Sequence, residues 1–465
     1  MKEIKVMKNI GKYAVLAGLV LAAVSCTDYL DIKPYGKTIP QTPEEYSALL
    51  QTRLYEIEEG EETIIGDVGS VADLECYADD LESKLTQYPT GNYVPLYVGD
   101  DLSDKQVLYA HLYEVIRDCN IVLDGLAEDT SEEASDVKGL AYALRGICYY
   151  NLLRNFCEPW EGNASGKLGV PLVTVFDMEA RTIRSSFSET VKRVADDLQS
   201  AIDCNIRNED YLFDSDVMLG YLARVHFWAG NYSQAASYAS QVLERHPLLG
   251  GDAYKSMMEE TGEGTGNILM KGGTRSTGSG DSQAISYLQC KPVSKQFINL
   301  FAEGEQDIRY GISVGEKRTF AKRPMACLRS AEMQCILMES QYHQGLETEA
   351  LASLNELRRH RITGVTDYTM ETLPPVDPDD NVKVDARGQA LTPLIYAILC
   401  ERRKELFLEG DRWYELKRNG RPEMWTHRQG RKYTTLEFMY TFPLPIADVI
   451  LTDGLVQNPG YDNVK

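Results

Sequence analysis

Residues 401–418 read ERRKELFLEGDRWYELKR and combine a strongly charged helix with a glycine turn. Glu401, Glu405 and Glu409 recur every four residues, so a helix places their carboxylates on one face. Gly410 follows at once and can adopt the left-handed conformation that commonly ends a helix, after which Arg412 can reach back to the carboxylates. We predict a buried or half-buried ion network that fixes the last helix against earlier helices, and no catalytic role. The residues assigned to this structural signature are Glu401, Arg402, Glu405, Glu409, Gly410, Arg412 and Trp413.

Upstream of this stretch, amphipathic helices come in pairs. One apolar stripe at helical spacing is formed by Leu108, Leu112, Val115, Cys119, Val122 and Leu126. Such a stripe predicts a helix with one buried face. The positions Leu222, Phe227, Gly230 and Ala235 recur at the same intervals as Leu337, Tyr342, Gly345 and Ala350. We therefore predict a mostly α fold of tetratricopeptide-like helical hairpin repeats starting near residue 105, with two unrelated hairpins as the alternative.

Three long segments without helical periodicity interrupt the helices, at residues 77–104, 250–292 and 372–392. Loops longer than about 15 residues in a compact protein are usually functional or disordered, so we expect a ligand site among them. The aromatic residues in these loops belong to no apolar helical stripe, so burial on one face of a helix does not explain their presence. The candidate ligand-binding residues are Tyr88, Tyr93, Tyr97, Asp100 and Asp101 in the first loop, Arg275, Asp281, Gln283 and Tyr287 in the second, and Trp160 after the second helix.

The amino terminus has the pattern of an export signal. Lys2, Lys5, Lys8 and Lys12 precede a 12-residue apolar run from Tyr13 to Val24, which is too short to span a bilayer as a helix. Ser25-Cys26 then resembles the end of a bacterial lipobox, in which the cysteine is joined to lipid. We expect residues 1–25 to be a lipoprotein signal peptide, Cys26 the lipidation site, and 26–465 one domain with an extended leader over 27–40. A secretory peptide that merely precedes a cysteine is the alternative.

Composition excludes several classes of function. With 48 Lys and Arg against 70 Asp and Glu, the chain has a net charge of -22, which argues against nucleic-acid binding. Ten scattered cysteines, one of them Cys26, do not form a disulfide framework. We find no metalloprotease, dinucleotide-binding or esterase motif.

Two weaker possibilities concern acidic residues. Asp377, Asp379 and Asn381 resemble the start of a calcium loop, although Val382 replaces its glycine, so a weak surface calcium ion is the only cofactor that we consider. Paired carboxylates such as Asp79/Asp80 or Asp100/Asp101 could serve glycoside hydrolysis, but solvated acidic loops are the commoner explanation. We predict that the protein is not an enzyme.

The motifs together resemble the SusD/RagB family of outer-membrane nutrient-binding lipoproteins. Residues 401–418 match that family's charged signature, residues 442–445 (FPLP) and 457–461 (QNPGY) match its carboxy-terminal ending, and the region from 394 to 465 holds both. Matches at residues 113–120, 144–150, 169–172 and 331–358 extend the likeness over nearly the whole mature chain.

The resemblance implies a function as well as a SusD-like fold. It implies a lipid-anchored protein on the outer face of the outer membrane that captures oligosaccharides and delivers them to a TonB-dependent, SusC-like transporter. It also implies that the loop before the first repeat helix carries ligand aromatics. An oligopeptide-binding member of the family is the alternative, followed by a surface glycan hydrolase or a protein-binding repeat scaffold.

Overall fold

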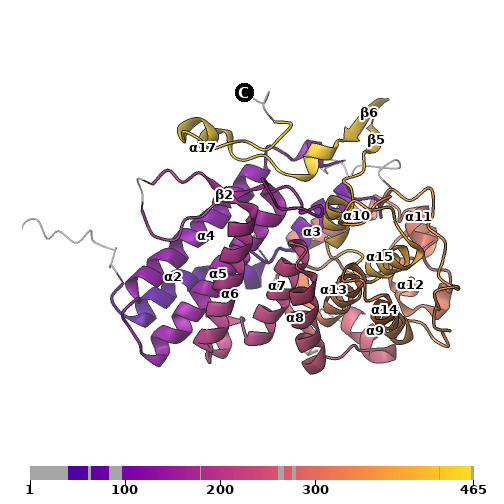
Figure 1. The fold of residues 1–465 in the computed structure, drawn as a ribbon, viewed down its shortest axis with the longest axis horizontal. Coiled ribbons are helices and arrows are strands. Elements are labelled where there is room, and N and C mark those ends of the chain that lie inside the picture. The colour runs from indigo at the N-terminus through magenta and orange to yellow at the C-terminus, as the bar shows by residue number, and fades with distance from the viewer. Residues whose placement is uncertain are drawn as a thin grey trace, which may run out of the picture.

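The computed structural model describes residues 40–60, 64–82, 97–177, 180–259, 267–274, 279–428 and 430–461 (Figure 1). The helices are α2 (Pro43–Glu59), α3 (Val68–Tyr77), α4 (Lys105–Gly125), α5 (Glu132–Phe156), α6 (Phe187–Cys204), α7 (Ser215–Trp228), α8 (Tyr232–Arg245), α9 (Gly251–Glu259), α10 (Ser279–Gln289), α11 (Lys295–Ile298), α12 (Ile308–Ser313), α13 (Ser330–His343), α14 (Glu347–Arg361), α15 (Pro393–Glu405), α16 (Asp411–Arg418) and α17 (Ile446–Leu451). The signal peptide, Cys26 and nearly all of the leader lie outside the described residues.

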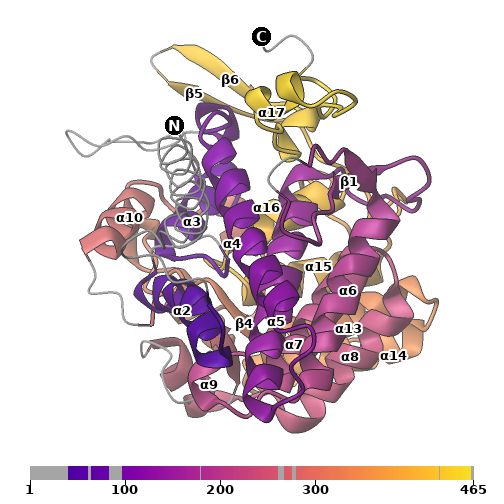
Figure 2. The same ribbon diagram turned by 90° about the vertical axis from the view of Figure 1, so that its left-hand side faces the viewer.

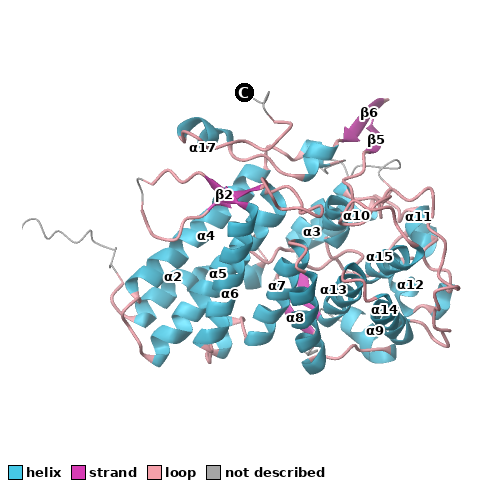
Figure 3. Cartoon of the chain, in the orientation of Figure 1, coloured by secondary structure: helices cyan, strands magenta, loops and turns pink. Residues whose placement is uncertain are grey.

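The helices pack as successive antiparallel neighbours, which confirms the predicted mostly α fold (Figure 3). Helix α5 lies between α4 and α6, α7 pairs with α8, and α13 pairs with both α8 and α14 (Figure 2). The stripe predicted on residues 108–126 faces this core, because Leu112, Val115 and Cys119 are fully buried. Among the described residues, no helix is both long enough and apolar enough to cross a bilayer.

The two hairpins with matching sequence intervals also have matching turns. Gly230 between α7 and α8 has φ 73°, and Gly345 between α13 and α14 has φ 78°. Ala235 and Ala350, which follow these turns on the second helix of each hairpin, are fully buried. The left-handed glycine allows the chain to reverse sharply, and the alanine allows close approach of the two helices.

The described residues also form three two-stranded antiparallel sheets. They pair β1 (Leu168–Pro171) with β2 (Arg184–Ser186), β3 (Ile268–Lys271) with β4 (Cys327–Arg329), and β5 (Met424–Arg428) with β6 (Arg431–Thr435). The β5–β6 pair forms a regular hairpin from Met424↔Thr435 to Arg428↔Arg431, and it projects beyond the helices on the same side of the molecule as α17 (Figure 1).

Two parts of the fold differ from the sequence-based description. Helices α2 and α3 precede the predicted start of the repeats near residue 105, and α3 begins with a capping box between Asp67 and Ser70. The segment at 250–292 is not wholly irregular, since it contains α9, β3 and α10. Helices α2, α3, α9 and α10 are short or polar, so each has too few regularly spaced apolar residues for the helical period to be recognised in the sequence.

The acidic side chains of the 401–418 stretch form the predicted buried ion network. Glu405 is fully buried and accepts hydrogen bonds from Arg329 Nη1 and Arg361 Nε, each at 2.8 Å. Glu401 accepts from Arg309 Nη2 at 2.6 Å, and Glu409 binds Arg329. These arginines come from β4, α12 and α14, so the network ties α15 and the turn after it to three other elements.

Two details of the prediction are wrong. Glu409 and Gly410 lie beyond the end of α15, and Gly410 precedes α16 instead of ending the helix that carries Glu401 and Glu405. Arg412 does not reach back to Glu401, Glu405 or Glu409; it binds Asp79 at 2.7 Å and Glu415 at 2.7 Å. Helix α15 ends at Glu405, and the positive φ of Gly410, 73°, redirects the chain into α16. The guanidinium therefore faces the segment that follows α3.

Candidate functional site

A cavity of about 330 Å³ lies between the end of α3 and the β5–β6 hairpin. We call it the hairpin cavity, and its principal lining residues are Tyr77, Asp79, Tyr97, Gln296, Asn381 and Trp425. Its walls thus come from four distant parts of the sequence. One of them is the predicted ligand loop at 77–104.

Aromatic rings mark the rim of the hairpin cavity. Trp425 on β5 is 53% exposed, and its strand neighbour Thr426 is 5% exposed, as expected for the alternation of a strand with one covered face. Tyr97 and Tyr433 lie with ring centroids 5.5 Å apart. His427, two residues beyond Trp425, has its ring centroid 6.4 Å from the indole. Because Thr426 pairs with Tyr433 and Trp425 pairs with Thr434, Trp425 and His427 lie on the exposed face of the hairpin, and Tyr433 lies on the covered face with Tyr97.

Polar groups line the floor of the hairpin cavity. Asn381 Nδ2 donates to Asp79 Oδ2 at 2.8 Å, and Gln296 Nε2 donates to the Asp379 carbonyl oxygen at 3.0 Å. Burial alone would raise the pKa of Asp79, but the nearby guanidinium groups of Arg403 and Arg412 outweigh it and hold that pKa below its usual value. The floor thus carries a fixed carboxylate with its amide neighbour already oriented.

Of the first-loop candidates that the structure describes, only Tyr97 lines the hairpin cavity. Asp101 is buried and accepts a hydrogen bond from Tyr77 Oη at 2.5 Å, so it braces the wall. Asp100 lies in the short 3-10 helix between Tyr97 and Asp101, and it does not line the hairpin cavity. Tyr88 and Tyr93 lie outside the described residues.

The second-loop candidates lie on or near α10, which packs against α3. Gln283 Nε2 donates to Tyr287 Oη at 2.5 Å, one turn along the helix. For Asp281 only the backbone, within α10, is described, and Arg275 lies outside the described residues. The structure thus brings the two predicted loops together, but Gln283 and Tyr287 do not line the hairpin cavity.

Trp160 occupies a different place. Its ring lies edge-on to Tyr232 at 5.9 Å, and it covers Gly230 in the α7–α8 turn, where an added Cβ would lie 2.5 Å from the indole. Trp160 therefore packs on the α7–α8 turn, and it does not line the hairpin cavity.

The sequence analysis missed Trp425 and Tyr433. A signal for them exists, because residues 424–428 and 431–435 flank Gly430, and Gly430 with φ 75° fits a tight hairpin turn. Rings on such a hairpin have one face toward solvent by default.

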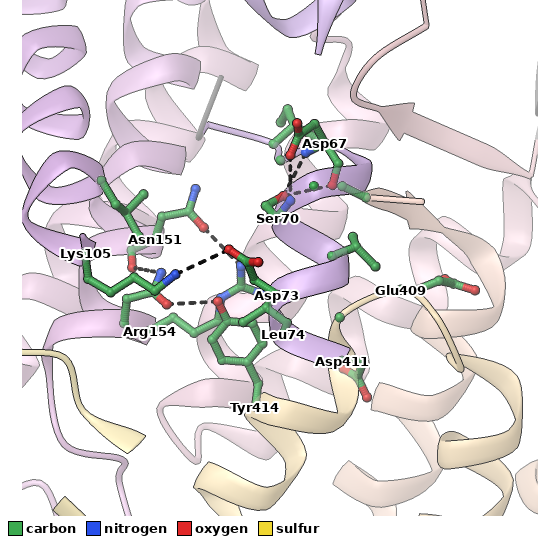
Figure 4. A pocket seen from close by; sticks show the side chains of 18 of the residues that line it. Asp67, Ser70, Asp73, Leu74, Lys105, Asn151, Arg154, Glu409, Asp411 and Tyr414 are labelled. Carbon is green, nitrogen blue, oxygen red and sulfur yellow. Dashed lines mark hydrogen bonds and ion pairs between the residues drawn. The ribbon is translucent and has the colours of Figure 1, made fainter. Parts of the chain in front are cut away.

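A larger cavity of about 610 Å³ lies beside α3 and α4 (Figure 4). We call it the lateral cavity, and its principal polar lining residues are Ser70, Asp73, Lys105, Asn151, Arg154 and Tyr414. Lys105, Asn151 and Arg154 lie on one side of it and Glu409 on the other. Burial is the main cause that raises the pKa of Asp73 to about 6, against the opposing charge of Lys105 at 3.7 Å.

Of the acidic pairs that could have served hydrolysis, Asp79/Asp80 is engaged in ion pairs, whereas Asp101 of the other pair accepts a hydrogen bond from Tyr77. Asp79 binds Arg412, and Asp80 accepts from Arg403 Nε at 2.5 Å. In the predicted calcium loop, Asp377 Oδ1 accepts the Asp379 N–H at 2.8 Å, and the Asn381 amide is bound to Asp79. Within the described ranges, no cluster of three or more His, Cys, Asp or Glu side chains is arranged to hold a metal ion. The calcium site stays a prediction.

The comparisons with known proteins agree with the fold. Residues 28–227 match a family model described as starch-binding and associating with the outer membrane, and residues 227–461 match the SusD family model. No curated protein matches the sequence significantly.

Solved structures give the same result at low sequence identity. A SusD superfamily protein from Bacteroides vulgatus is 17% identical with a TM-score of 0.68, covering 91% of this chain and 100% of its own. A SusD-like carbohydrate binding protein from the same species is 18% identical with a TM-score of 0.67, covering 90% and 98%. Bacteroides fragilis NanU is 15% identical with a TM-score of 0.62, covering 93% and 100%. From the two family models, which together span residues 28–461, the chain belongs to the SusD family of outer-membrane-associated binding proteins.

Proposed function

We propose that the protein is a lipid-anchored, surface-exposed member of its family that captures oligosaccharides in the hairpin cavity without cleaving them. It then delivers them to a TonB-dependent transporter. The observation that carries the proposal is the exposed indole of Trp425 at a cavity that Tyr97 and a floor of fixed polar groups also line. An oligopeptide ligand remains the alternative.

The geometry suits a sugar for two reasons. The apolar face of a pyranose ring stacks on an aromatic ring, and an indole with one open face provides that surface. Hydroxyl groups need both donors and acceptors, which Asn381, Gln296 and Asp79 supply at the floor. A site with an apolar platform and a few oriented polar groups is typical of small-ligand binding.

A second feature supports the transporter as partner. Ile450 and Leu451 on α17 are 74% and 72% exposed, and Val456 and Ile183 beside them are also exposed. The α17 loop and the segment before β2 touch, since a Cβ added at Gly454 would lie 3.5 Å from Ile183. We call Ile183, Ile450, Leu451 and Val456 the α17 patch. Clustered exposed aliphatic groups mark protein or membrane contact surfaces, and a lipid anchor at Cys26 would keep this patch beside a membrane protein.

Trp425→Ala should weaken binding of an oligosaccharide selected from a glycan array by about fivefold to tenfold, because one stacked ring contributes ~1–1.4 kcal/mol. Tyr97→Ala should have a similar but smaller effect, since this ring also packs on Tyr433. Isothermal titration calorimetry measures both. A parallel peptide array tests the alternative ligand class.

Tyr55→Ala is the matched control, because Tyr55 is an equally exposed ring on α2 that does not line the hairpin cavity. Unchanged affinity in both the Trp425 and Tyr97 variants would place the ligand elsewhere. Release of shorter products from the bound oligosaccharide would contradict a purely binding function.

A further inference from the structure

The lateral cavity adjoins a small inner cavity of about 30 Å³ at the crossing of α5, α7 and α16. Arg154, Arg224, Glu332, Asp411 and Tyr414 line both. The further lining residues of the inner cavity include Trp228, Arg402, Glu415 and Arg418. The lateral cavity thus leads into the inner cavity, whose lining is rich in arginine.

The inner cavity is lined by residues with polar atoms that lack a hydrogen-bond partner among the described residues. Four are donors, namely Arg154 Nε, Trp228 Nε1, Arg402 Nη1 and Arg418 Nη1, and one is an acceptor, Glu415 Oε2. Trp228, Arg402 and Arg418 are each more than nine-tenths buried. An unsatisfied buried donor costs free energy, so four around one small space favour an occupant that brings acceptors.

Charge points to an anionic acceptor. The buried carboxylates that line the two cavities are paired, Asp411 with Arg402, Glu332 with Arg224 and Glu415 with Arg412. Arg154 differs. No carboxylate of the described residues lies within ion-pair distance of it, and its guanidinium rests instead on Tyr414, 3.8 Å from the ring centroid, with one bond to Asn151. Among the described arginines that line the inner cavity, Arg154 is the one whose charge no carboxylate offsets.

The lateral cavity supplies the surroundings for a polar body attached to that anion. Lys105, Asn151 and Ser70 offer groups that can bond hydroxyls, and Leu74 offers an apolar face (Figure 4). Phe442 is a further apolar residue in the lining. Its 610 Å³ is in the size range of pockets that enclose small ligands, while the inner 30 Å³ has room for little more than a carboxylate or two waters.

We propose that the lateral and inner cavities form a second binding site, specific for a sugar unit that carries a carboxylate. The carboxylate enters the inner cavity and accepts hydrogen bonds from Arg154, Arg402, Arg418 and the Trp228 indole. The sugar ring stays in the lateral cavity. The ligand class rests on the proposed function of glycan capture, but the site is separate from the hairpin cavity.

The test compares a uronic acid disaccharide with its neutral, carboxyl-reduced counterpart by calorimetry on the mature protein. We expect the wild type to prefer the uronate by tenfold or more, because hydrogen bonds to charged groups are the strong ones. Arg154→Met should abolish the preference. This substitution leaves no buried carboxylate without its partner, so the fold should survive, which circular dichroism and thermal melting check.

Two further variants sharpen the assignment. Trp228→Phe removes one donor while keeping an aromatic ring, so it should lower uronate affinity by about fivefold. Arg359→Met removes an exposed guanidinium on α14 and controls for the loss of one positive charge; it should leave the preference intact. Trp425→Ala should also leave it intact, which separates this site from the hairpin cavity.

Three results would overturn the proposal. If Arg154→Met still prefers the uronate, Arg154 does not bind the carboxylate and the proposal loses its main residue. Equal stabilisation of the protein by formate or chloride and by the uronate would show a small-anion site to which the sugar ring adds nothing. Equal affinity for the acidic and the reduced disaccharide in the wild type would exclude carboxylate recognition, even if the hairpin cavity binds neutral glycans as proposed.

Discussion

Glu75 shows how far a single buried side chain can depart from its solution behaviour. It is 1% exposed on α3; one carboxylate oxygen accepts the Gly410 N–H at 3.0 Å, and the other has no partner among the described residues. Burial first, and the charge of Asp80 second, raise the pKa of Glu75 to about 8. The folded protein therefore keeps this carboxyl group protonated where an unfolded chain would ionise it.

This pKa predicts a pH-dependent stability. Between about pH 4.5 and 8 the unfolded state has lost the proton that the folded state retains, so the free energy of unfolding falls as pH rises. Glu75→Gln keeps an acceptor for Gly410 but cannot ionise. We expect it to be more stable than the wild type by about 1 kcal/mol or more at pH 8, and similar near pH 4.5.

Urea unfolding at several pH values measures this difference. Glu349→Gln, an exposed position on α14, is the control for removing one acidic group and should not change the pH slope. A wild-type slope that persists unchanged in Glu75→Gln would show that another group is responsible.

At the scale of elements, the two matched hairpins allow a paired test. Gly230 and Gly345 have nearly the same φ, but a Cβ at Gly230 would lie 2.5 Å from the Trp160 ring, whereas one at Gly345 meets nothing within 4 Å. Both alanine variants lose about 1 kcal/mol of stability because left-handed backbone disfavours a side chain.

Gly230→Ala should lose a further 1–3 kcal/mol or so, because the indole must move to admit the methyl group. Chemical denaturation of both variants gives the comparison. Equal losses would mean that Trp160 is not packed on the turn and would reopen its assignment as a ligand residue.

Elements with long apolar stripes were predictable from the sequence, and short ones were not. The stripe on residues 108–126 and the intervals around Gly230 and Gly345 identify helices because burial imposes the helical period on many positions. Each strand of the β5–β6 hairpin has only five residues, so the alternation of covered and exposed residues repeats too few times to predict a strand. Trp425 was therefore missed, whereas Tyr97 was found from a loop ring that lacked a helical explanation.

At the scale of the whole molecule, the α17 patch predicts an assembly. Ile450→Glu combined with Leu451→Glu should reduce recovery of a large outer-membrane β-barrel protein in a mild-detergent pull-down, since charged groups in an apolar contact lose hydration without gaining partners. Recovery should fall several-fold while oligosaccharide binding persists. Met370→Glu, at an exposed apolar position outside the patch, is the control.

Undiminished recovery from the double variant would place the contact elsewhere on the surface. Recovery of the monomer alone from the wild type would contradict the proposed partner.

The candidate site could be predicted only in part, because its walls meet across the whole chain. Tyr97 and Trp425 are far apart in sequence, and Asp79 is held by Arg412, 333 residues away. Sequence patterns show which residues lack a local explanation. They do not show which distant strand or turn will complete the cavity.

The buried ion network has a consequence for the order in which the polypeptide matures. Arg309, Arg329 and Arg361 all precede their acceptors, Glu401, Glu405 and Glu409, along the chain. During synthesis and export these guanidinium groups emerge before any of those acceptors, and burying them unpaired would be costly. Apart from α3, which packs on α10 and α16, the helices up to α6 make contacts mainly between near neighbours and can close early, whereas the half from α12 onward must wait. The signature therefore completes the packing of the second half last. While Glu401, Glu405 and Glu409 have not yet emerged, the elements from α12 onward stay unpacked.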